Sequence, residues 1–167
     1  FAGLTFVTGG DWSQAVPGFL GLAQNGLYVG TSQFGGSPYA ARSGPIAFEE
    51  AGLTPADVDY VSIYDSFTIT VLVTIEDLGF CAKGEGGPFV ADGALVSPGG
   101  RLPFNTDGGG LCNNHPGNRG GMTKIIEAVR QLRGEAHPKV QVKNCDIALA
   151  HGTGGALGAR HGSGTVI

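Results

Sequence analysis

Three side chains that can move protons stand out along the chain: Tyr64, His115 and His151. His115 lies in the tetrapeptide 114–117 (Asn-His-Pro-Gly), between a run of glycines at 108–110 and a stretch with helical periodicity. Imidazole exchanges protons near neutral pH, so we interpret His115 as a general base. The bare N–H groups of the glycine run and of the helix N-terminus would favour a developing negative charge beside it. The alternative is a solvent-exposed loop histidine.

His151 opens a second glycine-rich stretch, 151–158, directly after an apolar run. Glycines let the backbone bend around a ligand and aim N–H groups at it, so we expect a loop that shapes a substrate site. A plain turn between two strands is the alternative. Tyr64 stands where a strand is expected to pass into a helix, and its hydroxyl could bind an oxyanion or transfer a proton. The alternative there is a packing tyrosine.

The cysteines do not form a recognisable site. Cys112 lies three residues before His115, but neighbours that close in a loop rarely align, so we interpret it as a small packing residue. Cys81, Cys112 and Cys145 lack C-x-x-C spacing, and the four histidines lack H-x-x-x-H spacing. We therefore expect no metal, no disulfide framework and a reducing, cytoplasmic compartment.

Composition excludes some classes of protein and favours a partner. The net charge is −4 without a Lys/Arg run, which argues against nucleic-acid binding. No apolar run reaches the roughly 18–20 residues of a membrane helix. Hydrophobic residues make up 41% and charged residues only 14%, so we expect a partner chain or a missing half to cover part of the surface.

Hydrophobic periodicity predicts strands that alternate with helices. The expected strands cover 4–8, 27–29, 58–64, 140–142, 145–150 and 164–167, and the expected helices cover 38–53, 67–78 and 122–132. This order indicates an α/β fold with a mixed sheet covered by helices. Functional loops in such folds gather at the carboxyl ends of strands, so Tyr64, His115 and His151 could meet at one edge.

Two of these helices carry more detailed expectations. Asp65 and Ser66 are both good N-caps for the helix over 67–78. In the helix over 122–132, the apolar residues Met122, Ile125, Ile126, Val129 and Leu132 recur at helical spacing, which predicts that they form its core face.

Three motifs, in this order along the chain, resemble the C-terminal half of the thiolase superfamily. The block 64–67 (Tyr-Asp-Ser-Phe) stands where thiolases carry Asn-Glu-Ala-Phe and sterol-carrier-type thiolases carry His-Asp-Cys-Phe. The glycines at 108–110 followed by 114–117 are similar to the glycine run and the Gly-His-Pro-x-Gly motif of thiolases. The stretch 151–155 (His-Gly-Thr-Gly-Gly) resembles their Cys-x-Gly-Gly-Gly loop. The resemblance covers residues 37–167 and leaves 1–36 as an unassigned N-terminal segment, a loop or linker region.

The resemblance implies a βαβαβαββ half-domain whose partner half supplies the nucleophilic cysteine. His115 would activate that nucleophile, His151 would be the second acid/base, and Tyr64 would help to form an oxyanion hole for the thioester oxygen. The residues expected to contact the substrate are Gly110, Asn114, Gly154 and Gly155. No bound cofactor is implied, because coenzyme A enters as part of the thioester substrate.

The resemblance leads to three hypotheses of function. The first is a thiolase-like acyltransferase of lipid metabolism, such as an acetyl-CoA acetyltransferase, which makes or breaks a carbon–carbon bond in an acyl-CoA. The second is a retro-aldolase, a lyase that acts on a β-hydroxyacyl-CoA such as a steroid side chain, because Tyr64 resembles the lipid-transfer-protein branch. The third is a non-catalytic lipid-binding or scaffold subunit. The expected partners are an N-terminal thiolase half or second subunit, a second copy in a homodimer, and a small protein with zinc-ribbon and oligonucleotide-fold parts.

Overall fold

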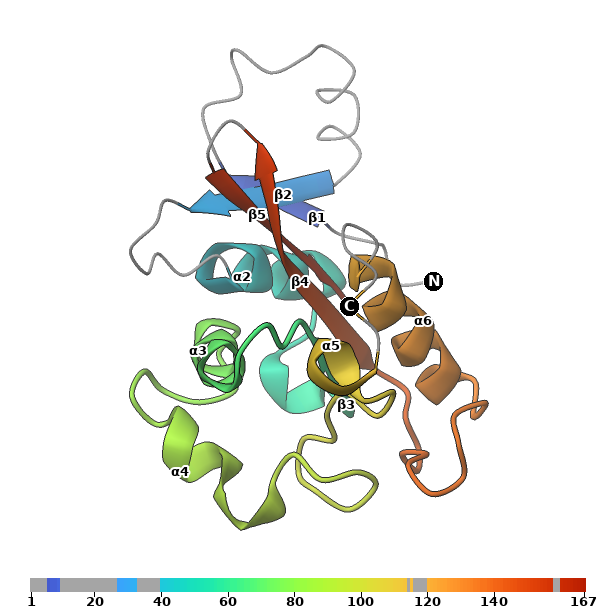
Figure 1. Ribbon diagram of the computed structural model, residues 1–167. Helices are drawn as coiled ribbons and strands as arrows, with labels where there is room; N and C mark the ends of the chain where they lie inside the picture. The colour runs from blue at the N-terminus through green and yellow to red at the C-terminus, as the bar shows by residue number, and fades with distance from the viewer. Residues whose placement is uncertain (1–5, 10–26, 33–39, 114, 116–119, 158–159) are drawn as a thin grey trace.

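The computed structural model describes residues 6–9, 27–32, 40–113, 115, 120–157 and 160–167. These residues form an α/β fold built on one five-stranded sheet with the order β1-β2-β5-β4-β3 (Figure 1). The strands are β1 (Phe6–Gly9), β2 (Leu27–Ser32), β3 (Tyr60–Ile63), β4 (Ala148–Leu157) and β5 (Arg160–Val166). The pairs β1–β2 and β3–β4 are parallel, and β5 runs antiparallel to β2 and β4, so the expectation of a mixed sheet is confirmed.

The helices follow the order of the expected ones, with additions. They are α2 (Ala40–Ala51), α3 (Thr68–Asp77), α4 (Gly86–Val90), α5 (Gly109–Cys112) and α6 (Gly120–Leu132), with short 3-10 turns η2 (Pro55–Asp57) and η3 (Ala91–Gly93). Glycines with positive φ follow α2, α3 and α6, namely Gly52 (68°), Gly79 (86°) and Gly134 (68°). A residue without Cβ adopts this conformation easily, so these glycines end the helices.

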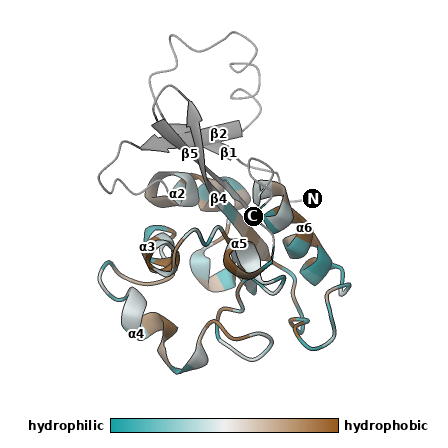
Figure 2. Ribbon diagram, viewed as in Figure 1, coloured by the Kyte–Doolittle hydropathy of each residue, from teal (hydrophilic) through white to brown (hydrophobic). Residues whose placement is uncertain are grey.

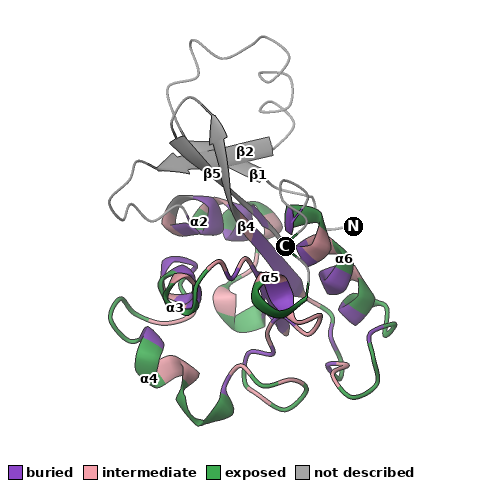
Figure 3. Ribbon diagram, viewed as in Figure 1, coloured by how far each residue is buried: buried purple, intermediate pink, exposed green. Residues whose placement is uncertain are grey.

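Two apolar clusters cover opposite faces of the paired strands β3 and β4. Side chains alternate between the faces of a strand, so Val61, Ile63 and Leu149 face α2 and α3, whereas Tyr60 and the two alanines of β4 that flank Leu149 face α6. Figure 1 shows the helices on both sides of β4, and Figure 3 shows that the start of this strand is buried. The core strands are therefore enclosed between two helical layers.

Two sequence-based expectations about strands are wrong. Residues 140–142 form no strand, because side chains satisfy their backbone: Gln131 Nε2 donates to the Val140 oxygen and the Val142 N–H donates to Gln131 Oε1. The stretch 151–157 is no loop but part of β4, which pairs with β5 through a register shift between Gly154 and Ala156. The glycines here give a long hairpin with a bulge rather than a nest of free N–H groups.

The expected core face of α6 is wrong in part: Ile125 packs against the apolar cluster of Tyr60, Ala148 and Ala150, but most of the buried side of the helix is polar. Lys124, Glu127 and Gln131 are buried on this helix, whereas Met122 is 55% exposed and Ile126 is 51% exposed. Hydrophobic and hydrophilic residues alternate around α6 (Figure 2). The buried side of the helix combines these three polar side chains with Ala128. The physical reason is a network of polar partners on β3 and in the loop before α5, described below.

Strands β1 and β2 join the same sheet as the rest of the chain, and the segment between them lies outside the described residues. The complete βαβαβαββ order and the domain boundary at 36/37 therefore stay predictions. In the part of the chain that the structure describes, no helix is long and apolar enough to cross a membrane.

Candidate active site

Tyr64 and His115 meet although 51 residues separate them. Tyr64 follows the last residue of β3, and its hydroxyl lies 2.6 Å from Nε2 of His115, with the ring centroids 5.6 Å apart. His115 is exposed and Tyr64 is half-buried, so a ligand can reach the pair. A phenol bonded to an imidazole can pass a proton from one ring to the other.

The loop that leads to His115 is held at the free edge of β3. The Val61 N–H donates to the Pro103 oxygen at 3.0 Å, and the Asn105 N–H donates to the Val61 oxygen at 3.1 Å. The Asn105 side chain then imitates a further strand residue: Oδ1 accepts from the Ile63 N–H, and Nδ2 donates to the Ile63 oxygen, each at 2.8 Å. This pairing places the glycine run directly beside Tyr64.

The carboxylate of Asp65 binds that glycine run. Its oxygens accept hydrogen bonds from the N–H groups of Gly110 (2.7 Å) and Leu111 (3.2 Å). The expectation that Asp65 or Ser66 caps α3 is wrong, because the N-cap position belongs to Phe67. We expected the N–H groups of the glycine run to be free to bind a negative charge on the substrate. The N–H groups of Gly110 and Leu111 are instead bonded to the Asp65 carboxylate.

His151 lies next to the pair through its backbone, but its side chain has other partners. The Tyr64 N–H donates to the His151 oxygen at 2.9 Å, whereas His151 Nδ1 lies 2.8 Å from the hydroxyl of Thr165. That hydroxyl lies 2.8 Å from the hydroxyl of Ser43 on α2. Burial lowers the pKa of His151 from 6.5 to about 3, so its imidazole is neutral at physiological pH.

Behind the pair, the polar face of α6 forms a buried network. The Thr106 hydroxyl donates to Glu127 Oε1 and lies 3.2 Å from the Tyr60 hydroxyl, and Gln131 Nε2 donates to the Thr106 hydroxyl oxygen at 2.8 Å. Burial raises the pKa of Tyr60 to about 12. Lys124 completes this face, with Nζ 3.9 Å from Oδ1 of Asp65.

Sequence reasoning missed the roles of Asn105, Asp65 and Lys124. Asn105 has φ +40°, a conformation in which asparagine is enriched, but its position before Thr-Asp-Gly suggests only a turn. The motif 64–67 contains Asp65, yet a cap was the simpler interpretation. Lys124 interrupts an apolar pattern, and hydrophobic periodicity gives no sign that a lysine in it is buried.

The remaining expected site residues are placed as follows. Asn114 lies outside the described residues. Gly154 and Gly155 belong to β4. Cys112 is an exposed free thiol on α5. Among the described residues, no group of three or more His, Cys, Asp or Glu side chains is arranged to hold a metal ion.

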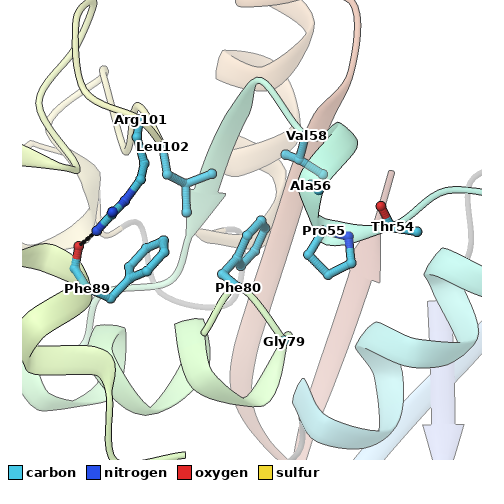
Figure 4. A pocket seen from close by; sticks show the side chains of 9 residues that line it. All are labelled: Thr54, Pro55, Ala56, Val58, Gly79, Phe80, Phe89, Arg101 and Leu102. Carbon is cyan, nitrogen blue, oxygen red and sulfur yellow. Dashed lines mark hydrogen bonds between the residues drawn. The ribbon is translucent and has the colours of Figure 1, made fainter. Parts of the chain in front are cut away.

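A hollow of about 550 Å³ lies at the opposite, amino end of β3 (Figure 4). Phe80 and Phe89 line it, and the Arg101 guanidinium lies 4.3 Å from the Phe89 ring centroid and donates to the Phe89 carbonyl. Neither Tyr64 nor His115 belongs to its lining. The hollow is therefore separate from the paired rings.

Fold and site together define a class of protein: an α/β domain with a histidine–tyrosine pair at the end of a strand. A model of the family described as "Thiolase C-terminal domain-like" matches residues 30–163, and the chain belongs to this family.

Its relatives include two classes of enzyme. The chain is 43% identical over 112 residues to an acetyl-CoA acetyltransferase of Methanothermobacter thermautotrophicus (67% of this chain, 29% of the relative). It is 44% identical over 120 residues to a 17-hydroxy-3-oxo-4-pregnene-20-carboxyl-CoA lyase of Mycobacterium tuberculosis (71% of this chain, 30% of the relative). A solved structure, the Ltp2-ChsH2(DUF35) aldolase, matches with a TM-score of 0.62 and 38% identity, covering 81% of this chain and 33% of that one. The chain thus spans about a third or less of the length of these relatives.

Proposed function

We propose that the chain supplies the proton-transfer groups of an active site that cleaves a carbon–carbon bond in a β-hydroxyacyl-CoA thioester by a retro-aldol reaction. The observation that carries this proposal is the 2.6 Å contact between the Tyr64 hydroxyl and Nε2 of His115. It moves the lyase ahead of the acyltransferase that the sequence favoured, because the bond to Tyr64 occupies the nitrogen that would otherwise activate a thiol. The lyase and aldolase relatives support the same choice.

The pair can perform both proton steps. Tyr64 accepts the proton of the substrate's β-hydroxyl while its own proton passes to Nε2 of His115. The Cα–Cβ bond then breaks, the β-carbon leaves as a ketone or aldehyde, and the electron pair forms an enolate with its charge on the thioester oxygen. Returning the proton to Cα gives the shortened acyl-CoA and restores the pair, so protons and electrons balance.

The direct test is product release from a β-hydroxyacyl-CoA. We expect Tyr64→Phe and His115→Ala each to lower kcat by at least about 100-fold, the usual contribution of general acid–base catalysis. Tyr60→Phe is the matched control: it removes a tyrosine hydroxyl from β3, the strand that ends directly before Tyr64, but one that bonds to Thr106. It should cost stability and leave kcat within about threefold. Full turnover of Tyr64→Phe would refute the proposal.

Thiolase-type acyl transfer is the second candidate, favoured by the acetyltransferase relative. It needs a nucleophilic cysteine, which we place in the two thirds of the relatives' length that this chain does not span. Incubation with an acyl-CoA followed by mass spectrometry separates the two reactions. An acyl adduct on a cysteine would establish transfer, whereas ketone or aldehyde release without an adduct would establish the lyase.

The exposed apolar side chains support the need for a partner half. Met122, Ile126 and Leu132 on α6 are exposed, as are Phe67 and Ile69 at the start of α3. Large exposed apolar side chains that lie on one helix face usually mark a contact surface. We propose that the remaining thiolase half covers them. A homodimer and a small zinc-ribbon partner remain part of this proposal, and light scattering and copurification would test them.

A further inference from the structure

Asp65 connects the two halves of the catalytic pair. It follows Tyr64 directly in the chain and is only 5% exposed. Both of its carboxylate oxygens accept backbone N–H groups of α5, from Gly110 at 2.7 Å and from Leu111 at 3.2 Å. Charge-assisted hydrogen bonds of this kind are stronger than neutral ones. The residue therefore fastens the helix that precedes His115 to the strand end that carries Tyr64.

Gly110, which is bonded to Asp65, also lies close to the rings of Tyr64 and His115. A Cβ atom built on Gly110 would lie 3.1 Å from Asp65 Oδ1, 3.5 Å from Cδ2 of His115 and 3.7 Å from Cε2 of Tyr64. The Gly110 backbone thus fills the space between the carboxylate and the two rings. If Asp65 released this backbone, the surface against which both rings pack would move.

Lys124 supplies the charge that balances Asp65. Its side chain is 1% exposed, and Nζ lies 3.9 Å from Asp65 Oδ1. Within the described part of the chain, Nζ has no hydrogen-bond partner. A buried charge without a counter-charge is costly, so each of the two groups stabilises the other in this position. Because Lys124 belongs to α6, the ion pair joins β3, α5 and α6 behind the catalytic rings.

We propose that Asp65 is a positioning residue for the Tyr64–His115 pair and that Lys124 is its buried counter-ion. This inference rests on the proposed function, since it assigns a role relative to that pair. Asp65 does not touch the substrate in this account. It sets the distance over which Tyr64 and His115 exchange a proton, and proton transfer depends on a heavy-atom distance of about 2.6–3.2 Å.

Asp65→Asn is the first test, because it keeps the size but turns one acceptor oxygen into a donor that faces an N–H group. We expect kcat to fall at least tenfold with KM within twofold, and the Tyr64 Oη–His115 Nε2 distance to lengthen in a crystal structure of the variant. The double variant Asp65→Asn with Lys124→Met removes both charges. It should regain thermal stability relative to Asp65→Asn while kcat stays low.

The matched control is the double variant Asp77→Asn with Lys83→Met. These two residues form a second ion pair, on α3 and the turn that follows it. It should leave kcat and the ring-to-ring distance unchanged. The proposal is overturned if folded Asp65→Asn keeps the 2.6 Å contact and normal kcat, or if the double variant recovers full kcat. Failure of the proposed function is distinguishable: the wild type would then lack lyase turnover, whereas the crystallographic distance would still report on positioning.

Discussion

Gly109 shows how little space separates the glycine run from the site. A Cβ atom there would lie 2.3 Å from Asp65 Oδ2 and 2.8 Å from Asn105 Nδ2, and the residue has φ +62°. Gly134 has a similar φ of +68° with nothing within 4 Å of such an atom. The two glycines therefore separate the effect of backbone conformation from that of a close contact.

We expect Gly134→Ala to lower the free energy of unfolding by about 1 kcal/mol, the cost of a positive φ for alanine. Gly109→Ala should cost at least about 2 kcal/mol more, because the new methyl group must displace a buried carboxylate that is bonded to Gly110 and Leu111. Denaturant unfolding of both variants measures the difference. Equal losses would mean that the contact with Asp65 yields without cost.

Among the helices, α6 is stabilised by polar contacts on its buried side. Gln131 Nε2 donates to the Thr106 hydroxyl and to the Val140 oxygen, while Oε1 accepts from the Val142 N–H at 2.9 Å. The neighbouring Leu132 is 42% exposed. We therefore expect Gln131 to contribute more to this chain's stability than the larger apolar Leu132 beside it.

Gln131→Ala should lower the free energy of unfolding by about 2–4 kcal/mol, because it leaves several buried donors and acceptors without partners. Leu132→Ala should cost less than about 1 kcal/mol. Chemical denaturation of the two variants, made side by side, checks this order. The opposite order would restore the core face that hydrophobic periodicity predicts.

The elements could be predicted from sequence where local rules decide them. The glycines after α2, α3 and α6 mark true helix ends, and β3 follows from its alternating apolar residues. Periodicity misled on α6, because it reports that a helix is amphipathic but not which face meets the sheet. The strand character of 151–157 was missed because glycines usually indicate loops, whereas the hairpin partner β5 makes this glycine-rich stretch a strand.

For the candidate site, the residue types indicated Tyr64 and His115, and the structure brings them together. The contact itself could not be read from the sequence, since it depends on Asn105 pairing with β3 and on Asp65 binding α5. His151 illustrates the opposite case. Its motif favours a site residue, but the pleat of β4 turns its imidazole towards Thr165.

At the scale of the whole molecule, buried titratable groups predict how stability varies with pH. On the acid side the group is His151, with a pKa of about 3 in the folded protein against 6.5 unfolded. Below pH 6.5 the unfolded chain binds a proton that the folded chain does not. Stability that is fully present above pH 6.5 is therefore lost as the pH falls towards 3.

We expect the free energy of unfolding to fall by up to about 1.4 kcal/mol per pH unit between pH 6.5 and 4.5, before the carboxyl groups protonate. In His151→Gln this slope should disappear. His137→Gln, which changes an exposed histidine, is the control and should keep it. Denaturant titrations at a series of pH values supply the measurement, and an unchanged slope in His151→Gln would show that another group is responsible.

On the alkaline side, burial raises the pKa of Cys145 from 9.0 to about 11 and that of Tyr60 from 10.0 to about 12. The folded protein keeps these protons longer than the unfolded chain does, so their contribution to stability is present below pH 9 and is lost as the pH rises through both ranges. The loss of stability above pH 10 includes the contribution of Tyr60. Its hydroxyl contacts Thr106, which is bonded to the buried Glu127.

We expect Cys145→Ala to flatten the loss of stability between pH 9 and 11 and Tyr60→Phe to flatten it between pH 10 and 12. Absorbance of tyrosinate gives an independent measurement, because in the folded protein the buried Tyr60, with a pKa of about 12, should ionise later than a tyrosine that is open to solvent. Tyr60→Phe should remove that late step and leave the earlier ones in place. If Tyr60 instead ionises together with the other tyrosines in the folded protein, the network between β3 and α6 is open to solvent, and the polar face of α6 does not form a sealed layer on the sheet.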